Sequence, residues 1–128
     1  DVEEYIASVE PEPGPILLLD DPSINESIER GRRIFEDPNV GCAQCHPAPL
    51  YTDLRMHDVG TRSQYDRRDD FDTPTLLELW RTGPYLHDGT AVYLSDVLTE
   101  RNVDDQHGRT SHLSDEEIRD LATFLESL

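Results

Sequence analysis

The clearest pattern of apolar and polar positions lies at the end of the chain. Ser114 and Glu117 have the spacing of a capping box, in which each side chain satisfies a backbone amide of the first helical turn. Apolar residues then recur every three or four positions: Ile118, Leu121, Phe124, Leu125 and Leu128. This spacing predicts a helix from Ser114 onward with one buried face.

A second helix is predicted between residues 23 and 35. Ser23 and Glu26 have capping-box spacing, and Pro38 and Gly41 would stop the helix after about Phe35. The residues expected on its buried line are Ile24, Ile28, Gly31 and Phe35.

The rest of the chain predicts little further regular structure. Two shorter helices are expected over residues 75–80 and 94–101, and a polar stretch occupies residues 62–72. No alternating run of β-branched residues is long enough to indicate a sheet. The predicted fold class is therefore all-α.

The two ends of the chain share a pattern. Residues 1–9 and residues 120–128 both place acidic, apolar, aromatic and serine positions in the same register. The match is short, and two amphipathic helices can share it by chance. The alternative is that residues 1–10 form the last helix of a preceding, similar domain. Residues 11–22, with four prolines, would then be a stiff linker, and residues 23–128 the main domain.

Charge restricts the partners. The 128 residues include 28 acidic and 11 basic ones, for a formal net charge of −17. Such a surface repels nucleic acid and anionic membranes, but it permits docking to a basic protein. A solvated, salt-adapted surface would have the same composition. No apolar stretch approaches the ~20 residues of a membrane span, so none is expected.

Both cysteines lie in the pentapeptide Cys42-Ala43-Gln44-Cys45-His46. This Cys-x-x-Cys-His pattern is typical of covalent haem c attachment, with the two thiols joined to the porphyrin and the histidine bound to iron. A thioredoxin-like redox pair would need a strand before it and a helix after it, which the flanking prolines and Gly41 do not suggest. A zinc site would need a fourth ligand from elsewhere.

The flanks of this motif resemble class I cytochromes c. The segment Gly31-Arg32-Arg33-Ile34-Phe35 shortly precedes Cys42, and that family has a Gly-x-x-x-aromatic pattern at this place. The resemblance implies that the first and last helices cross closely at Gly31, against Phe124, around one covalent haem. A glycine inside a helix costs about 1 kcal/mol relative to alanine, so a packing reason is expected.

Two further segments resemble the C-terminal domain of bacterial di-haem cytochrome c peroxidases and of propeller-fused cytochromes. They are residues 71–76 (FDTPTL) and residues 80–89 (WRTGPYLHDG). In that family this domain holds the electron-transfer haem, while peroxide is reduced at a haem in the preceding domain. The resemblance implies a periplasmic or otherwise exported bacterial protein with a redox protein partner. Only one haem motif is present here.

The second axial ligand of the iron is the open question. The resembled families use a methionine before the last helix, but residues 90–113 contain none. They do contain His107, in a DQHGRTS segment similar to the loop of the propeller-fused relatives, and His112. His107 is the preferred candidate and Met56 the second. His112, His57, His87 and an open site remain alternatives.

Other residues receive roles by resemblance. Trp80, Arg81 and Arg109 could hydrogen-bond the haem propionates, although core packing and surface ion pairs would explain them equally well. His87 is assigned a hydrogen-bonding role near the haem edge. No residue is expected to act as acid, base or nucleophile. The predicted function is one-electron transfer through a single haem; the alternative is the relay or catalytic part of a di-haem peroxidase-like enzyme.

Covalent attachment has a direct test. Because Cys42 and Cys45 are expected to form thioether bonds, denaturation and acid–acetone extraction should leave one haem per polypeptide. The measurement is the absorbance of the precipitated chain, and colour that extracts completely would contradict the prediction.

Overall fold

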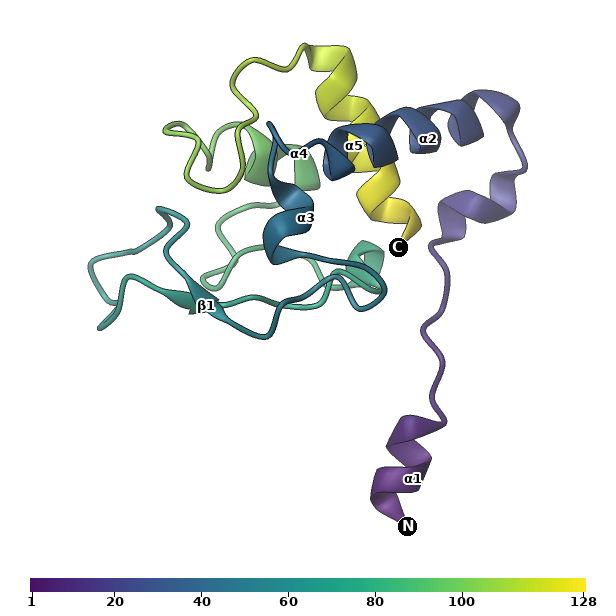
Figure 1. Cartoon of the computed structure of the whole chain (residues 1–128), viewed down its shortest axis with the longest axis horizontal. Coiled ribbons are helices and arrows are strands. Elements are labelled where there is room, and N and C mark those ends of the chain that lie inside the picture. Colours follow the sequence, from purple (N-terminus) through teal and green to yellow (C-terminus); the bar gives the residue numbers. More distant parts are fainter.

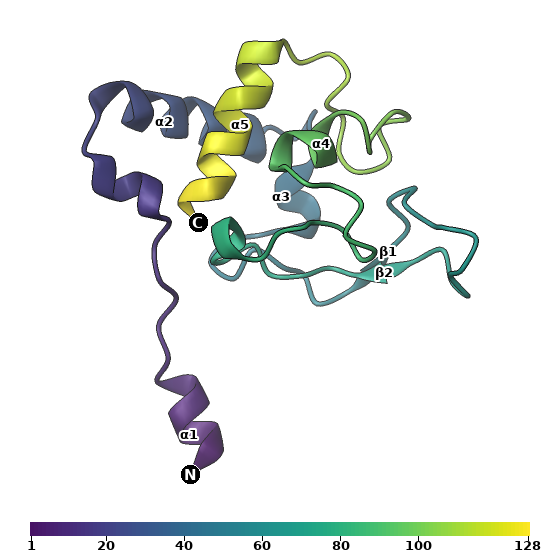
Figure 2. The same ribbon diagram turned by 180° about the vertical axis from the view of Figure 1, so that it is seen from behind.

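Two helices form the centre of the structure. The computed structural model describes residues 1–128, and in it α2 (Pro22–Glu36) lies across α5 (Asp115–Ser127), as Figures 1 and 2 show from opposite sides. The other elements are short, and long loops connect them. The mostly helical class predicted from the sequence is confirmed.

The starts of the two helices follow different rules. α5 has the predicted capping box, with the Glu117 amide donating to Ser114 Oγ and the Ser114 amide donating to the Glu117 carboxylate. At α2 the prediction of a Ser23–Glu26 box was wrong. Asp21 is the cap and accepts from the Ser23 amide at 2.8 Å, with Pro22 in the first turn. An aspartate followed by proline makes the better start, because proline has no amide to satisfy.

The contact between α2 and α5 is made at a glycine. A Cβ atom added to Gly31 would lie 2.0 Å from the carbonyl oxygen of Asp120 and 2.7 Å from Cβ of Phe124. Beside it, the buried Asp120 carboxylate accepts from Arg30 Nε at 2.6 Å and from Ser27 Oγ at 2.6 Å. The Arg30 hydrogen bond is the main cause that lowers the pKa of Asp120. The contact therefore includes an ion pair between Arg30 and the buried Asp120 carboxylate. Removing Arg30 would leave a buried charge without a partner, at a cost in stability.

A cluster of nine buried apolar residues surrounds this contact. α2 and α5 supply six of them, α4 (Leu94–Leu98) supplies two, and Leu76 comes from a loop earlier in the chain. The nine are Ile28, Phe35, Leu76, Leu94, Leu98, Ile118, Leu121, Phe124 and Leu125.

The smaller elements differ from the predictions. A turn of helix, α3 (Cys42–Cys45), holds the cysteines. Two residues each of β1 (Met56–His57) and β2 (Phe71–Asp72) pair antiparallel, a contact too short to leave a sequence signal. α4 ends at Leu98 rather than near Arg101. The Thr110 hydroxyl donates to the Leu98 carbonyl at 2.6 Å, in place of a helical amide.

The helix predicted over residues 75–80 is absent, and only a 3₁₀ turn, η2 (Leu79–Arg81), forms there. The Thr75 hydroxyl donates to the Leu50 carbonyl at 2.6 Å. Glu78 has φ 59°, in the left-handed region, which interrupts any helix through the segment. A tertiary hydrogen bond and a turn therefore override the helical spacing.

The N-terminal segment extends from the helical centre. α1 (Val2–Ala7) projects away from the rest of the chain in Figure 1, and residues 1–13 are all exposed. The chain then returns to the domain at Glu12, whose amide donates to Glu78 Oε1 at 2.8 Å, and η1 (Pro15–Leu19) follows. No helix in the structure combines the length and apolarity that crossing a bilayer requires.

The glycine contact can be tested by adding a side chain. Gly31→Leu should lower the free energy of unfolding by about 1–3 kcal/mol, because overpacked positions force neighbouring backbone apart. Thermal or denaturant unfolding measures this free energy. Asn25→Ala, at an exposed position of the same helix, is the control.

Gly31→Ala sharpens the test. In an uncrowded helix, replacing glycine by alanine raises the free energy of unfolding by about 1 kcal/mol. Stabilisation by Gly31→Ala would therefore show that the helices do not meet there.

Candidate functional site

The two cysteines lie on one helical turn. Gly41, with φ 90°, ends the preceding loop in a left-handed conformation and lets α3 begin directly at Cys42. Residues three apart in a helix share a face, so this turn places Cys42 and Cys45 on one side. His46 follows as the last residue of the turn, with its amide bonded to the Cys42 carbonyl at 3.0 Å.

His46 is held in one tautomer. Its side chain is buried, and Nδ1 lies 2.8 Å from the Tyr51 carbonyl oxygen. A carbonyl only accepts, so Nδ1 must donate its proton and Nε2 keeps a free lone pair. Burial lowers the pKa of His46 below its usual value. The result is a neutral imidazole with one nitrogen available to a metal ion.

The His107 ring lies close to the His46 ring. The ring centres are 6.4 Å apart and the planes are inclined by 43°. Burial, with a smaller contribution from His46, lowers the pKa of His107 to about 4. Its Nδ1 is buried without a hydrogen-bond partner. Residues far apart in the sequence thus bring two neutral imidazoles together beside the cysteine turn.

This arrangement fits a metal bound between two histidines. Metal–imidazole bonds are about 2 Å long, so rings on opposite sides of one ion have centres roughly 6 Å apart. Metals bind the neutral imidazole, which is the form that burial favours at both positions. Together with two free thiols on the adjoining turn, the donor set suits haem c.

The thiols do not fit a redox disulfide pair. Burial raises the pKa of Cys42 to about 11, and burial, then the charge of Asp53, raises the pKa of Cys45. A thioredoxin-like cysteine needs a lowered pKa, because the thiolate is the reactive form. No strand precedes α3 either.

A zinc site is incomplete. The structure contains one group of three ligand atoms within 4.8 Å of one another, from Cys45, Asp53 and His57. It includes neither Cys42 nor His46, and a structural zinc site takes four ligands. His57 Nε2 is already 2.7 Å from the Asp53 carboxylate.

Met56 and His112, two other candidates for the second axial position, are both exposed, Met56 by 43%. Met56 precedes His57 in β1, and successive residues of a strand point to opposite sides. Since His57 points toward Asp53 and Cys45, Met56 points away from them. Of the candidates, His107 is the one whose ring lies beside that of His46.

Trp80 and Arg81 are engaged elsewhere. Trp80 Nε1 donates to the Glu12 carbonyl at 3.4 Å. Arg81 lies over the Trp80 ring, 5.5 Å from its centre, and pairs with Glu78. These contacts join η2 to the N-terminal segment and leave the propionate role predicted for both residues without a structural contact in its favour.

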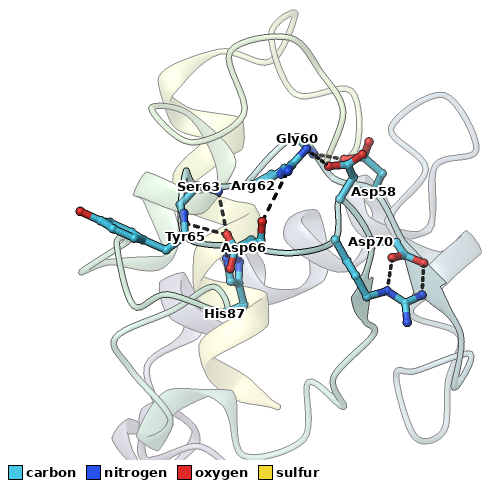
Figure 3. Close-up of polar contacts among 10 residues, drawn as sticks. Asp58, Gly60, Arg62, Ser63, Tyr65, Asp66, Asp70 and His87 are labelled. Atoms are coloured by element: carbon cyan, nitrogen blue, oxygen red, sulfur yellow. Dashed lines mark hydrogen bonds and ion pairs between the residues drawn. The ribbon is translucent and has the colours of Figure 1, made fainter.

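His87 belongs to a separate polar cluster (Figure 3). Its ring stacks on Phe71 at 3.7 Å, and Nε2 lies 2.9 Å from the Asp66 carboxylate. Asp66 also accepts from the amide and hydroxyl of Ser63, and these bonds, the amide first, lower its pKa to about 2. His87 therefore has a hydrogen-bonding role, which holds the loop of residues 58–70 against residues 85–89.

Two contributors to the site have no sequence signal. Tyr51 acts through its carbonyl, which every residue has, and is placed by a left-handed conformation with φ 53°. Asn102 lies at the centre of the loop that carries His107 and bonds to the backbone of that histidine. Neither residue belongs to a motif.

The chain is similar in sequence to several known proteins. It is 35% identical to hydrazine synthase subunit gamma of Kuenenia stuttgartiensis, over 97% of this chain and 47% of that protein. It is 33% identical to the methylamine utilization protein MauG of Methylorubrum extorquens, over 87% and 37%. Cytochrome-c peroxidase IdrP1 of Denitromonas iodatirespirans is 25% identical, over 85% and 42%. No protein-family model matches the chain.

The fold has a counterpart among solved structures. A chain of Kuenenia stuttgartiensis hydrazine synthase, from crystals pressurized with xenon, superposes with a TM-score of 0.81 at 32% identity. The match covers 97% of this chain and 52% of that one. The chain thus spans about half the length of the relatives it matches.

Proposed function

The chain is related to the c-type cytochromes and di-haem peroxidases, and on that premise we propose that it transfers single electrons through one covalent haem c. Cys42 and Cys45 would hold the haem by thioether bonds, and His46 and His107 would be the axial ligands. The observation that carries the proposal is the pair of histidine rings 6.4 Å apart beside the cysteine turn, with the His46 side chain and the Nδ1 atom of His107 both buried.

The chain's own residues would bind and orient the group. When bound, haem c supplies a one-electron iron couple whose potential the axial ligands and their hydrogen bonds adjust. The Tyr51 carbonyl accepts from His46 Nδ1, which raises the basicity of that ligand. Crossed α2 and α5 helices around the haem, in the class I cytochrome arrangement, belong to the same proposal.

Electron transfer is favoured over peroxide chemistry at this site. Two protein ligands would leave the iron no open position, whereas peroxide reduction needs one. The second candidate function, a relay within a di-haem peroxidase-like enzyme, draws on the similarity to a protein named cytochrome-c peroxidase. In that case α1 would end a preceding domain and residues 11–22 would link it to residues 23–128.

Partners and location complete the proposal. The net charge of −17 suits a basic redox partner. The relative named as a subunit supports function within an assembly. Haem c attachment in bacteria, as implied by the resembled family, would place the protein in the periplasm or otherwise outside the cytoplasm.

The axial ligand can be identified by spectroscopy. If His107 is the ligand, the oxidised protein should lack the weak near-infrared sulfur-to-iron band of methionine-ligated cytochromes. His107→Ala should give a high-spin spectrum and bind cyanide readily, because it opens the site. Met56→Leu is the matched control and should change neither. The reverse outcome for the two variants would assign Met56 instead.

Salt dependence separates a relay from an enzyme. Oxidation of the reduced protein by a small basic cytochrome should be fast and should slow with added salt, because screening weakens long-range attraction to an acidic surface. Turnover of hydrogen peroxide should stay near that of free haem peptides. Robust peroxide turnover with a high-spin resting spectrum would favour the peroxidase function. Partner rates that ignore salt would contradict docking through the acidic surface.

A further inference from the structure

A single buried side chain, Asn102, organises the loop that carries His107. Asn102 is 5% exposed and follows α4. Its Oδ1 accepts from the His107 amide at 2.8 Å. Its Nδ2 lies 3.2 Å from the His107 carbonyl, 2.8 Å from that of Gly108 and 2.8 Å from Thr110 Oγ1. The side chain thus bonds to the backbone of His107 on both sides of its Cα atom.

The loop is also tied to the cysteine turn. The Arg109 amide donates to the Val40 carbonyl at 2.8 Å. A Cβ atom at Gly108, whose φ is 79°, would lie 3.3 Å from that carbonyl and 3.7 Å from Cys42 Sγ. The Asp105 carboxylate accepts from the amides of Thr110 and Ser111, which joins the two ends of residues 105–111. The backbone that Asn102 holds therefore has a defined position relative to the cysteines.

The two histidines are oriented by different means. His46 is fixed at its own ring, through Nδ1 and the Tyr51 carbonyl. The His107 ring has no such support, since its Nδ1 is buried without a partner. Its position must come from packing and from the backbone, and Asn102 is the side chain that bonds to both backbone groups of that residue.

We infer that Asn102 is the positioning residue for the second axial ligand: its amide holds the His107 backbone so that the imidazole lies opposite His46. The inference rests on the proposed function, in which His107 binds the haem iron. The hydrogen bonds of the Asn102 side chain go to the loop backbone and to Thr110, and none goes to either ring. Its loss should release His107 and open the iron part of the time, without removing the ligand.

The test compares Asn102→Ala with His107→Ala in the haem-loaded protein. Asn102→Ala should raise the affinity for cyanide by about tenfold or more, because apparent affinity scales with the fraction of molecules whose site is open. It should add a high-spin component to the oxidised spectrum. Asn102→Asp keeps the acceptor for the His107 amide but replaces the donor to the two loop carbonyls with an oxygen that repels them, so it should open the site as well. Asn102→Asp provides the same spectroscopic comparison if Asn102→Ala does not fold.

A merely structural role is excluded by a matched control. Asp120→Ala removes another buried, multiply bonded polar side chain, at the α2–α5 contact away from the loop. It should lower stability while leaving the spin state and cyanide affinity unchanged. Added imidazole should restore the low-spin spectrum of both Asn102→Ala and His107→Ala.

The outcomes are distinct. If His107→Ala opens the site but both Asn102 variants keep the parent spectrum and cyanide affinity, the positioning role is wrong and the axial assignment stands. If Asp120→Ala changes the spectrum as much as Asn102→Ala, the effect is general loosening and the inference is overturned. If His107→Ala changes nothing, the axial assignment fails, and the inference fails with it.

Discussion

The close approach of α2 and α5 at Gly31 is the constraint on which the rest of the structure depends. With the Asp120 carbonyl oxygen 2.0 Å from where a Cβ atom would lie, only hydrogen fits between the two backbones. α2 leads within a few residues to the cysteine turn, and the loop that carries His107 leads into α5. One contact therefore sets the positions of both halves of the site. Hydrogen bonds from Ser27 and Arg30 to the buried Asp120 carboxylate add stability beside this contact, whereas the glycine fixes how closely the two backbones approach.

The site combines a rigid local motif with a distant loop. The cysteine turn and His46 are positioned by bonds within ten residues, including the one from Nδ1 to the Tyr51 carbonyl. His107 comes from sixty residues further along and depends on Asn102 and on the contact between Arg109 and Val40. Burial lowers the pKa of both imidazoles and so favours the neutral form, which is the form that metals bind. An arrangement of this kind is suited to holding a cofactor in place.

Relatives with different names match this chain over part of their length. The matched proteins include a hydrazine synthase subunit, a methylamine utilization protein and a cytochrome-c peroxidase, and this chain covers 37–47% of each. A half-length match transfers the fold and the cofactor class more safely than it transfers a reaction, because function depends on the site and on the remaining domains. The exposed apolar residues of α1, which are Val2, Tyr5 and Ile6, are consistent with the proposal that this helix belongs to a neighbouring domain.

The sequence by itself determined what depends on residues a few positions apart. These features are the Ser114–Glu117 cap, the apolar faces of the two main helices, and the spacing of Cys42, Cys45 and His46. The net charge follows from the composition alone. Tertiary structure decided the rest. The Thr75 hydroxyl bonds to the Leu50 carbonyl in a segment where a helix was predicted. The meeting of His46 with His107, and the Asn102 side chain that holds it, arise from contacts between segments that no local spacing relates. Local signals record short-range hydrogen bonds and periodicity, whereas these contacts exist only once the helices have packed.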